Sequence, residues 1–226
     1  MAAVGRQAGT RHRTRPKRVT SLPVASRLIA RFACLAPDLC VFPPGRLLWR
    51  VYARNGNHPT TWDAFRYYGP TTSRFDPHLA PARPQARGIM YVAENGTTCL
   101  AEVFQDARTI NRTRSQPWLV GFRTRRAITL LDMRGNWPTQ AGGSQAICTG
   151  DRRRARRWSQ AIYDAYPAIE GIIYPSKMHG GNISLAFYER AATVLPSIPD
   201  FNRALADDEV SAMLKNAASV LNYKLL

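Results

Sequence analysis

A chain of 226 residues with 45% apolar residues, five Trp and nine Tyr is long and apolar enough for a proper core, which excludes wholesale disorder. Its length indicates one domain with extensions, or at most two small domains. The net charge of +17 favours an anionic partner (nucleic acid, an acidic protein or a phosphate-bearing ligand), and a solvated basic surface explains it equally well. Residues 1–31 contain eight Lys or Arg and no acidic residue, so about half of the excess lies near the N-terminus.

The sequence contains no run of about 18 apolar residues, so no membrane span is expected. Its N-terminus lacks the apolar region of a signal peptide. The four cysteines form no Cys-x-x-Cys pair, and we expect reduced thiols in a cytoplasmic protein. No metal site is expected, because the histidines are dispersed without ligand spacing: His12, His58, His78 and His179.

The first 45 residues are predicted to stand apart from the main domain. Residues 1–22 are basic and are expected to form a disordered arm. Residues 24–36 have the pattern of one amphipathic helix that ends before Pro37, and residues 42–45 have the composition of a hinge. An N-terminal helix and hinge are therefore assigned to residues 23–45.

The main domain is predicted to begin with a strand over residues 46–52, in which Arg50 and Tyr52 share a face because alternate residues do. Residues 53–87 are expected to form a long, largely irregular loop, and loops of this length in compact domains are usually functional or disordered. Five aromatic residues argue for order in this loop. Arg66 and Arg74 lie among them. This mixture of basic and aromatic residues suits the binding of a ligand that carries rings and phosphates. The alternative is that the aromatic side chains only anchor the loop to the domain.

The central stretch is a predicted strand–turn–helix unit. Residues 89–93 form a short apolar strand that carries Tyr91, and residues 94–96 break it. An apolar helix start follows, with Glu102 one to two turns in. Because an unpaired buried carboxylate is costly, Glu102 is the first candidate for a catalytic role, the alternative being an ordinary, partly exposed helix residue.

The second half of the chain mixes strands and helices without a repeat. Residues 118–123 and 127–132 have the pattern of a β-hairpin, and Asp151 is a candidate N-cap for the helix that follows. A buried strand is predicted over residues 171–176 and a terminal helix over 207–223. The fold class is therefore α+β, with small mixed sheets and flanking helices. Four arginines form either an anion or partner surface or a solvated helix face: Arg152, Arg153, Arg156 and Arg157.

The sequence has no serine nucleophile elbow, P-loop, dinucleotide fingerprint or zinc motif. The side chains that remain as candidates for chemistry are Arg50, Arg74, Tyr91, Glu102 and Ser176. They come from four separate segments, so only a folded chain brings them to one site.

The order of these residues resembles the RES-domain family, which is named for an Arg, a Glu and a Ser. The matching motifs are Ser73-Arg-Phe, Met90-Tyr-Val-Ala followed by Cys99-Leu-Ala-Glu-Val-Phe, and Ile173-Tyr-Pro-Ser-Lys. The resemblance covers roughly residues 46–195, the expected catalytic domain, and leaves residues 196–226 as a C-terminal helical extension. It implies a fold similar to ADP-ribosyltransferase toxins. It also implies a bacterial toxin of a type II toxin–antitoxin pair, whose partner is a helix-turn-helix antitoxin.

The activity implied by the resemblance is NAD degradation, by hydrolysis or phosphorolysis of the nicotinamide–ribose bond. NAD would be the substrate, and inorganic phosphate is a candidate co-substrate. A single carboxylate fits this chemistry, because nicotinamide leaves as a neutral molecule and needs no general acid. Glu102 would stabilise the developing positive charge. The resemblance also implies that Arg74 and Arg50 bind the pyrophosphate and that Tyr91 contacts the nicotinamide. Ser176 would form a hydrogen bond with ribose or phosphate. Tyr52 and Lys177 are further residues expected to bind the substrate. Ser184 is a rival for the family serine.

The chain departs from the family at the first signature arginine, where Thr72-Ser-Arg-Phe-Asp76 replaces a commonly found Gly-Gly-Arg-Trp-Asn-like stretch. The details of the pocket there, and the roles of the terminal segments in antitoxin binding or homo-oligomerisation, are not determined by the sequence. Two alternatives to NAD cleavage remain open. One is an ADP-ribosyltransferase that modifies a protein, and the other is a non-enzymatic nucleic-acid-binding module, supported by the charge but by no recognised motif.

Overall fold

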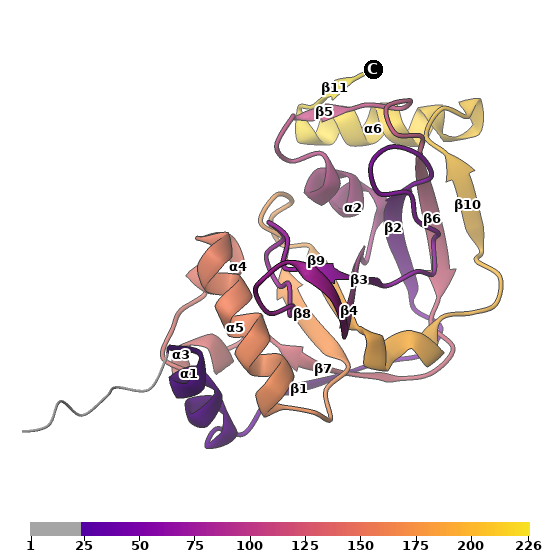
Figure 1. Ribbon diagram of the computed structural model, residues 1–226. Helices are drawn as coiled ribbons and strands as arrows, with labels where there is room; N and C mark the ends of the chain where they lie inside the picture. The colour runs from indigo at the N-terminus through magenta and orange to yellow at the C-terminus, as the bar shows by residue number, and fades with distance from the viewer. Residues whose placement is uncertain (1–23) are drawn as a thin grey trace, which may run out of the picture.

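Most of the strands belong to one mixed sheet. The structure is a computed structural model that describes residues 24–226, so the predicted basic arm over residues 1–22 lies outside the described residues. The nine-stranded sheet has the order β1-β7-β8-β9-β4-β2-β6-β10, with β3 paired to β4 (Figure 1). Its strands are β1 (Leu39–Phe42), β2 (Leu47–Ala53), β3 (Arg66–Gly69), β4 (Arg83–Ala93), β6 (Pro117–Arg123), β7 (Ile128–Asp132), β8 (Gly171–Pro175), β9 (Ile183–Tyr188) and β10 (Phe201–Ala204).

The helices and a small second sheet surround this sheet. Strands β5 (Thr109–Ile110) and β11 (Lys224–Leu225) pair in parallel. The α-helices are α1 (Val24–Ala33), α2 (Gly96–Val103), α3 (Trp137–Gln140), α4 (Ala146–Thr149), α5 (Arg152–Ala165) and α6 (Ser211–Leu221), and the 3-10 helices are η1 (Glu189–Val194) and η2 (Asp208–Val210). The predicted α+β class with flanking helices is confirmed, and its strands are gathered mainly in one large sheet.

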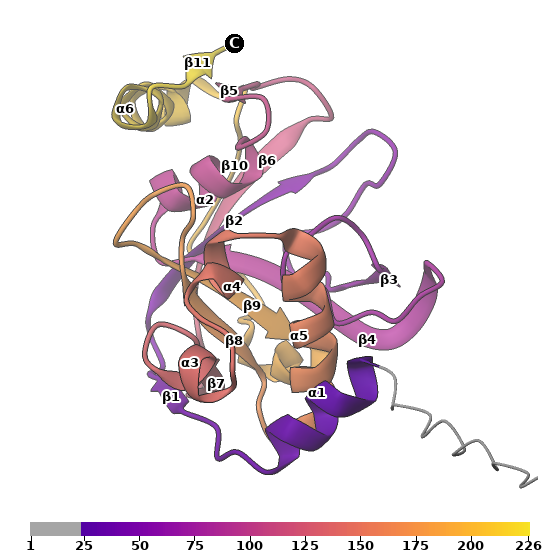
Figure 2. The ribbon, with the colours of Figure 1, turned by 90° about the vertical axis from the view of Figure 1, so that its left-hand side faces the viewer.

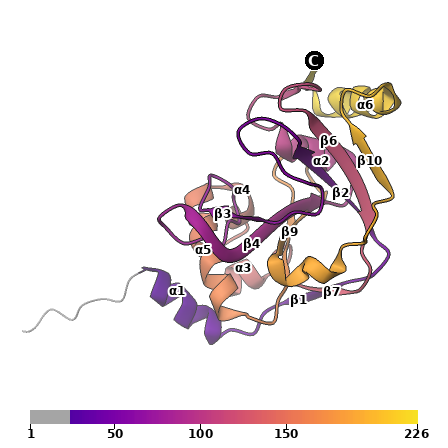
Figure 3. The ribbon, with the colours of Figure 1, turned by 45° about the vertical axis from the view of Figure 1, so that its right-hand side comes forward.

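The large sheet is bent between β4 and β2, which share the single register pair Trp49 and Ala93. The part formed by β2, β6 and β10 stands at an angle to the rest, as Figure 3 shows. Apolar side chains of both parts meet in one core cluster that includes Leu48, Phe122 and Phe187, all fully buried. Burial of these side chains holds the two parts together.

Helices cover the outer face of each part. Helices α1 and α5 lie side by side over β8 and β9 (Figure 2), and their core contains Phe32, Trp137 and Trp158, whose rings pack edge to face or tilted. Helices α2 and α6 lie over the other part, where Leu100 and Leu214 are fully buried. Helix α2 consequently stands beside the bend in the sheet, where it positions the candidate site.

Several predicted elements are confirmed in place. Helix α1, strand β2 and strand β8 lie where the hydrophobic pattern put them. Asp151 caps helix α5, because its side chain accepts hydrogen bonds from the backbone N–H groups of Arg153 and Arg154. The local sequence pattern was sufficient to predict these elements, because each of them has a clear apolar periodicity.

Three predictions about connections were wrong. Phe42 belongs to β1, which pairs with β7, so the predicted hinge over residues 42–45 starts inside the sheet. The predicted irregular loop over residues 53–87 contains β3 and the first half of β4. Strands β6 and β7 do not form a hairpin, because β6 pairs with β2 and β10 whereas β7 pairs with β1 and β8. In the first and third cases the hydrogen-bonding partner is distant in sequence, since β1 pairs with β7 and β6 with β2.

Within residues 24–226, no helix is long and apolar enough to cross a membrane. No group of three or more His, Cys, Asp or Glu side chains in that part of the chain is arranged to hold a metal ion. The four cysteines are free thiols, and Cys99 is buried.

Candidate active site

A cavity of about 860 Å³ opens beside the bend in the sheet. Its wall is built from strands β2, β3, β4, β8 and β9, helices α2 and α4, the start of α5, and the loops before and after β3, after α2 and after β8. Five of the seven candidate site residues line it, namely Arg50, Arg74, Tyr91, Glu102 and Lys177. Ser176 does not line the cavity itself but bonds Glu102, which does. The size is that of a site for a small-molecule ligand or cofactor.

Helix α2 is fixed at its start by a polar network. The Asn95 side chain caps the helix by accepting hydrogen bonds from the backbone N–H and the hydroxyl of Thr98, at 2.7 and 2.8 Å. The amide of Asn95 donates to Asn182 Oδ1 at 2.9 Å, and Thr98 also contacts His179 at 2.9 Å. Since Asn182 and His179 belong to the loop after β8, this network ties that loop to α2.

The same arrangement brings Glu102 and Ser176 together, although 74 positions separate them. Ser176 Oγ donates to Glu102 Oε1 at 2.6 Å, and the backbone N–H of Lys177 donates to the same oxygen at 3.1 Å. The Ser176 hydroxyl itself accepts hydrogen bonds from two backbone N–H groups of the same loop, at 3.2 and 3.0 Å. Glu102 is half-buried on the cavity wall, so the carboxylate expected to be buried is in fact accessible to a ligand.

Arg74 enters the same cavity from the loop after β3. Its guanidinium donates to the backbone oxygens of Gly150 at 2.7 Å and Thr149 at 3.3 Å, at the C-terminal end of helix α4. Burial lowers the pKa of Arg74, and Glu102 is among the groups that act in the opposite direction. Arg74 remains a cation at neutral pH, since an arginine pKa lies far above 7. It makes no direct hydrogen bond to Glu102 or Ser176; it shares the cavity with Glu102.

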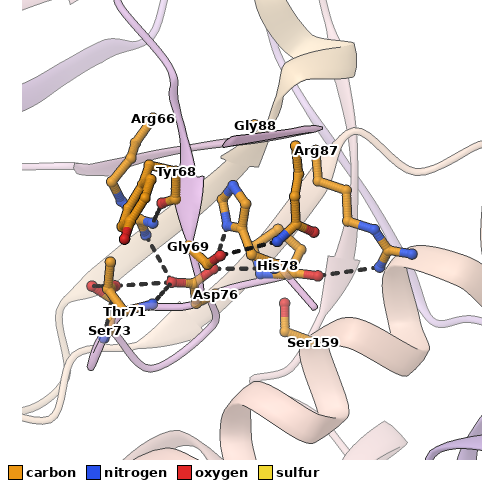
Figure 4. Close-up of polar contacts among 12 residues, drawn as sticks. Arg66, Tyr68, Gly69, Thr71, Ser73, Asp76, His78, Arg87, Gly88 and Ser159 are labelled. Carbon is orange, nitrogen blue, oxygen red and sulfur yellow. Dashed lines mark hydrogen bonds and ion pairs between the residues drawn. The ribbon is translucent and has the colours of Figure 1, made fainter. Parts of the chain in front are cut away.

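A buried carboxylate, Asp76, fixes the loop that carries Arg74 (Figure 4). Asp76 Oδ2 accepts hydrogen bonds from Arg66 Nη2 at 3.0 Å, from the Thr71 N–H at 2.7 Å and from the Thr71 hydroxyl at 2.8 Å. Asp76 Oδ1 accepts from the His78 N–H at 3.1 Å and contacts His78 Nδ1. The His78 ring and N–H, the Thr71 N–H and Arg66 together hold the pKa of Asp76 far below its usual value, against the opposing effect of burial.

Arg50 and Tyr52 have different surroundings, although they share a face of β2. Arg50 lines the cavity, and its Nη1 donates to the backbone oxygens of Trp62 and Ala64, both at 2.8 Å. Burial lowers the pKa of Arg50 to about 10, so its guanidinium is charged at neutral pH. Tyr52 lies outside the cavity, and its hydroxyl donates to Asn202 Oδ1 at 2.9 Å. Tyr52 therefore packs in the core away from the cavity lining, and its substrate contact stays a prediction.

Two buried hydroxyls on the cavity wall lack hydrogen-bond partners among the described residues, namely those of Tyr91 and Ser184. They come from adjacent strands, since Ala93 of β4 is the register partner of Ser184 on β9, and Tyr91 lies two residues before Ala93 on the same face. Burial raises the pKa of Tyr91, so its hydroxyl is neutral and able to donate. Ser184 does not contact Glu102; that position belongs to Ser176.

Tyr174 also lines the cavity and was missed from the sequence. It is the register partner of Ser184, and its pKa is raised mainly by burial and next by the Glu102 charge. The signal for it was present, because alternation along β8 puts Tyr174 on the same face as Ser176. Arg152, at the start of α5, was noted only as part of a surface cluster, yet it lines the cavity and donates to Gln105 at 2.7 Å.

The two cysteines that line the cavity are not activated. Burial raises the pKa of Cys99 to about 12 and that of Cys148 to about 12. Both are therefore neutral thiols at physiological pH, and a thiolate is the form that acts as a nucleophile. The charged groups that line the cavity are the carboxylates of Glu102 and Asp106, the ammonium group of Lys177 and several guanidinium groups.

This arrangement defines an α+β protein with one polar cavity, in which a carboxylate faces arginines and buried hydroxyls. A protein-family model for the RES domain matches residues 47–207, and the chain belongs to that family. The match includes β10, beyond the end of the predicted catalytic domain at residue 195.

No curated protein matches the chain. Among solved structures, it is similar to a chain in the crystal structure of the M. tuberculosis MbcT–MbcA toxin–antitoxin complex. That match has a TM-score of 0.54 and 15% sequence identity, and it covers 86% of this chain and 96% of that chain. At this identity the likeness shows a shared fold.

Proposed function

We propose that this protein cleaves the nicotinamide–ribose bond of NAD and acts as the toxin of a toxin–antitoxin pair. The observation that carries the proposal is the Glu102 carboxylate on the cavity wall, with Oε1 held by Ser176 at 2.6 Å and by the Lys177 N–H at 3.1 Å. No hydrogen bond from a described residue occupies Oε2. That oxygen is the one available to a substrate.

The chemistry needs this kind of group. As the bond between ribose C1′ and the pyridine nitrogen breaks, its electron pair goes to nicotinamide, which leaves neutral, and positive charge develops on the ribose. A fixed carboxylate stabilises this charge, and it does so more strongly in a site of low dielectric than in water. An oxygen of water or phosphate then bonds to C1′; with water, a proton is released to solvent.

The arginines supply the opposite charge for the substrate's pyrophosphate. Arg74 and Arg50 both line the cavity and both are charged at neutral pH. Guanidinium groups suit phosphate oxygens because their N–H groups form a planar fork. Each arginine is already oriented by backbone oxygens, so little side-chain entropy is lost on binding. The unpartnered Tyr91 and Ser184 hydroxyls then suit the polar groups of the nucleoside.

The toxin role is supported by membership of the RES-domain family and by the shared fold with a chain of a toxin–antitoxin complex. We infer that an antitoxin of the helix-turn-helix type is the partner. The proposed substrate is a cytoplasmic metabolite, and we therefore assign the activity to the cytoplasm.

The deciding experiment is nicotinamide release from NAD by the purified protein, with and without inorganic phosphate. Release in both buffers, with free ADP-ribose as product, indicates hydrolysis; release only with phosphate, with a phosphorylated ADP-ribose, indicates phosphorolysis. Label from NAD found on a macromolecule indicates ADP-ribosyl transfer to protein instead. Intact NAD after long incubation in both buffers would contradict the proposal.

The toxin role has its own test in cells. Expression of the wild-type chain is expected to arrest bacterial growth and deplete NAD, whereas Glu102→Gln at the same expression level is expected to do neither. Growth arrest by both proteins would show that toxicity does not come from this site.

A further inference from the structure

A second, smaller cavity borders the first turns of helix α5. It has a volume of about 390 Å³ and is lined by residues of α1, α5 and the turn after α3. We call it the arginine pocket and define it by its lining residues: Leu28, Arg31, Gly142, Asp151, Arg154, Arg157 and Trp158. Figure 2 shows α1 and α5 adjacent to one another.

Three guanidinium groups converge on this pocket from two helices. Arg154 and Arg157 lie three positions apart, on the same side of α5, and Arg31 comes from the last turn of α1. No ion pair to any of the three exists among the described residues, although acidic partners are available to many other arginines of the chain. The cations of the arginine pocket are therefore left with solvent as their partner.

Gly142 allows Arg31 to take this position. Its φ of +74° is one that residues with a side chain rarely adopt. A Cβ atom at Gly142 would lie 1.7 Å from Arg31 Nη2, so the guanidinium is packed directly over the glycine. The backbone of the turn thus accommodates the charged group at the pocket wall.

The single carboxylate of the pocket does not neutralise it. Asp151 Oδ1 accepts hydrogen bonds from the Arg153 and Arg154 N–H groups at the start of α5, at 2.5 and 3.0 Å. Three guanidinium groups against one carboxylate leave an excess of two positive charges. Leu28 and the buried Trp158 add an apolar surface beside them.

We propose that the arginine pocket binds a phosphate-bearing ligand. A phosphate group carries close to two negative charges on one centre and several acceptor oxygens, which matches an excess of two guanidinium groups in a small concave space. An acidic peptide brings one charge per side chain and would have to direct two carboxylates into the same cavity. The free phosphate or pyrophosphate ion and the phosphates of a nucleotide share the required chemistry.

This binding site is separate from the candidate active site but shares an element with it. Arg152 of α5 lines the larger cavity, whereas Arg154 and Arg157 line the arginine pocket. The residues just before α5 also accept the hydrogen bonds of Arg74. A ligand in the arginine pocket therefore contacts the helix that borders both sites.

An NMR titration of the full chain tests the proposal. The reporter is the indole N–H signal of Trp158, assigned by its loss in Trp158→Phe, because anions bound in the larger cavity do not contact this ring. The probes are inorganic phosphate, pyrophosphate, ADP and tetraglutamate. A saturable shift with the phosphate-bearing probes is expected. Tighter binding of ADP than of pyrophosphate identifies a nucleotide as the ligand class, and equal binding identifies the phosphate group alone.

Two double variants distinguish binding by the residues of the arginine pocket from attraction by the general positive charge of helix α5. Arg154→Gln with Arg157→Gln is expected to weaken binding at least about tenfold, since hydrogen bonds to charged groups are lost. Arg153→Gln with Arg156→Gln removes the same charge from the same helix, at two residues that do not line the pocket. Arg153 pairs with Asp151 at 3.6 Å, but this ion pair is exposed and contributes little, so binding is expected to change by less than about twofold. Arg31→Gln, on the other helix, is expected to act like the first pair.

Three results would overturn the proposal. They are equal weakening in both double variants, no response of the Trp158 signal to any phosphate-bearing probe, and tighter binding of tetraglutamate than of every such probe. The last result would assign the pocket to an acidic protein segment instead.

Discussion

Two acidic side chains, Asp76 and Glu102, are held in opposite ways. Both oxygens of Asp76 are occupied, by Arg66 and Thr71 on one side and by His78 on the other, and the side chain is fully buried. Glu102 is held through one oxygen only, by Ser176 and the Lys177 N–H, and it lies on a cavity wall.

The difference separates a structural carboxylate from one that is available for chemistry. A carboxylate whose acceptor sites are saturated by the protein has nothing left to offer a substrate, and its removal exposes several unsatisfied donors. A carboxylate fixed through one oxygen keeps its orientation and retains the other oxygen for a ligand. Asp76 therefore orders the loop that carries Arg74, and Glu102 is the carboxylate that we propose acts at the reaction centre.

The largest effect is expected from Glu102→Gln. The amide keeps the shape of the side chain but removes the negative charge that opposes the developing positive charge on ribose, so kcat is expected to fall by about 100- to 1,000-fold. The melting temperature is expected to change little, because the residue is half-buried at a cavity. Nicotinamide release under saturating NAD measures the effect.

Glu94→Gln is a matched control for this charge change. Glu94 lies just before helix α2 and pairs with the exposed Arg46 at 3.1 Å, outside the cavity wall. Surface ion pairs of this kind contribute little, so activity is expected to stay within about twofold of wild type. A similar loss in both variants would show that the overall charge near α2 matters, and not the Glu102 carboxylate.

Asp76→Asn is expected to act on stability first. The amide nitrogen cannot accept hydrogen bonds, so Arg66 or His78 is left without its partner, and the free energy of unfolding is expected to fall by about 3 kcal/mol. Urea denaturation measures this loss. Activity of the remaining folded protein is expected to show a raised KM, since the loop presenting Arg74 is loosened. An unchanged stability would contradict the assigned role of Asp76.

The pH dependence sharpens this test. The pKa of Asp76 is far below that of an unfolded aspartate, about 3.9, so the folded state favours the charged carboxylate. The stability from this shift is fully present above the unfolded pKa and is lost as pH falls from there toward the folded pKa. The stability difference between wild type and Asp76→Asn is therefore expected to be constant above about pH 5 and to shrink below about pH 4.

Ser176→Ala is expected to have a moderate effect on catalysis. It removes the 2.6 Å hydrogen bond that orients Glu102 but leaves the Lys177 N–H in place, so kcat is expected to fall by about tenfold to a hundredfold. Ser184→Ala leaves Glu102 untouched and removes a buried hydroxyl without a partner, so its effect is expected in KM for NAD. A larger loss of kcat from Ser184→Ala would reverse the assignment of the family serine.

Much of the candidate active site could be predicted from the sequence, but little of the strand pairing could. Glu102 and Ser176 were chosen from their motifs, and the structure joins them by a hydrogen bond. The alternation pattern also placed β2 and β8 correctly. The hairpin of β6 and β7 was predicted wrongly, because a short connection between two apolar segments does not show that each has a better partner elsewhere in the sheet.

The Asp76 network was not predictable for a related reason. In the sequence, Asp76 and His78 are ordinary polar residues of a loop rich in proline, and turn chemistry accounts for such residues without burial. Their burial depends on packing of this loop against β4 and α5: the Gln160 side chain donates to the His78 backbone oxygen, and Ser159 Oγ donates to the Phe75 backbone oxygen at 2.9 Å. Those contacts join segments more than 80 positions apart.

The smallest effect is expected from Tyr52→Phe. This variant tests whether a residue that shares a strand face with Arg50 also takes part in substrate binding. Alternation correctly put Tyr52 on the same face of β2 as Arg50, yet only Arg50 reaches the cavity, because the Tyr52 ring packs beside Trp118 and its hydroxyl bonds Asn202. Removing that hydroxyl is expected to lower the free energy of unfolding by about 1 kcal/mol, and kcat/KM for NAD is expected to stay within about twofold. A tenfold loss of kcat/KM at unchanged stability would support the predicted substrate contact, because a core tyrosine has no other way to affect the reaction so selectively.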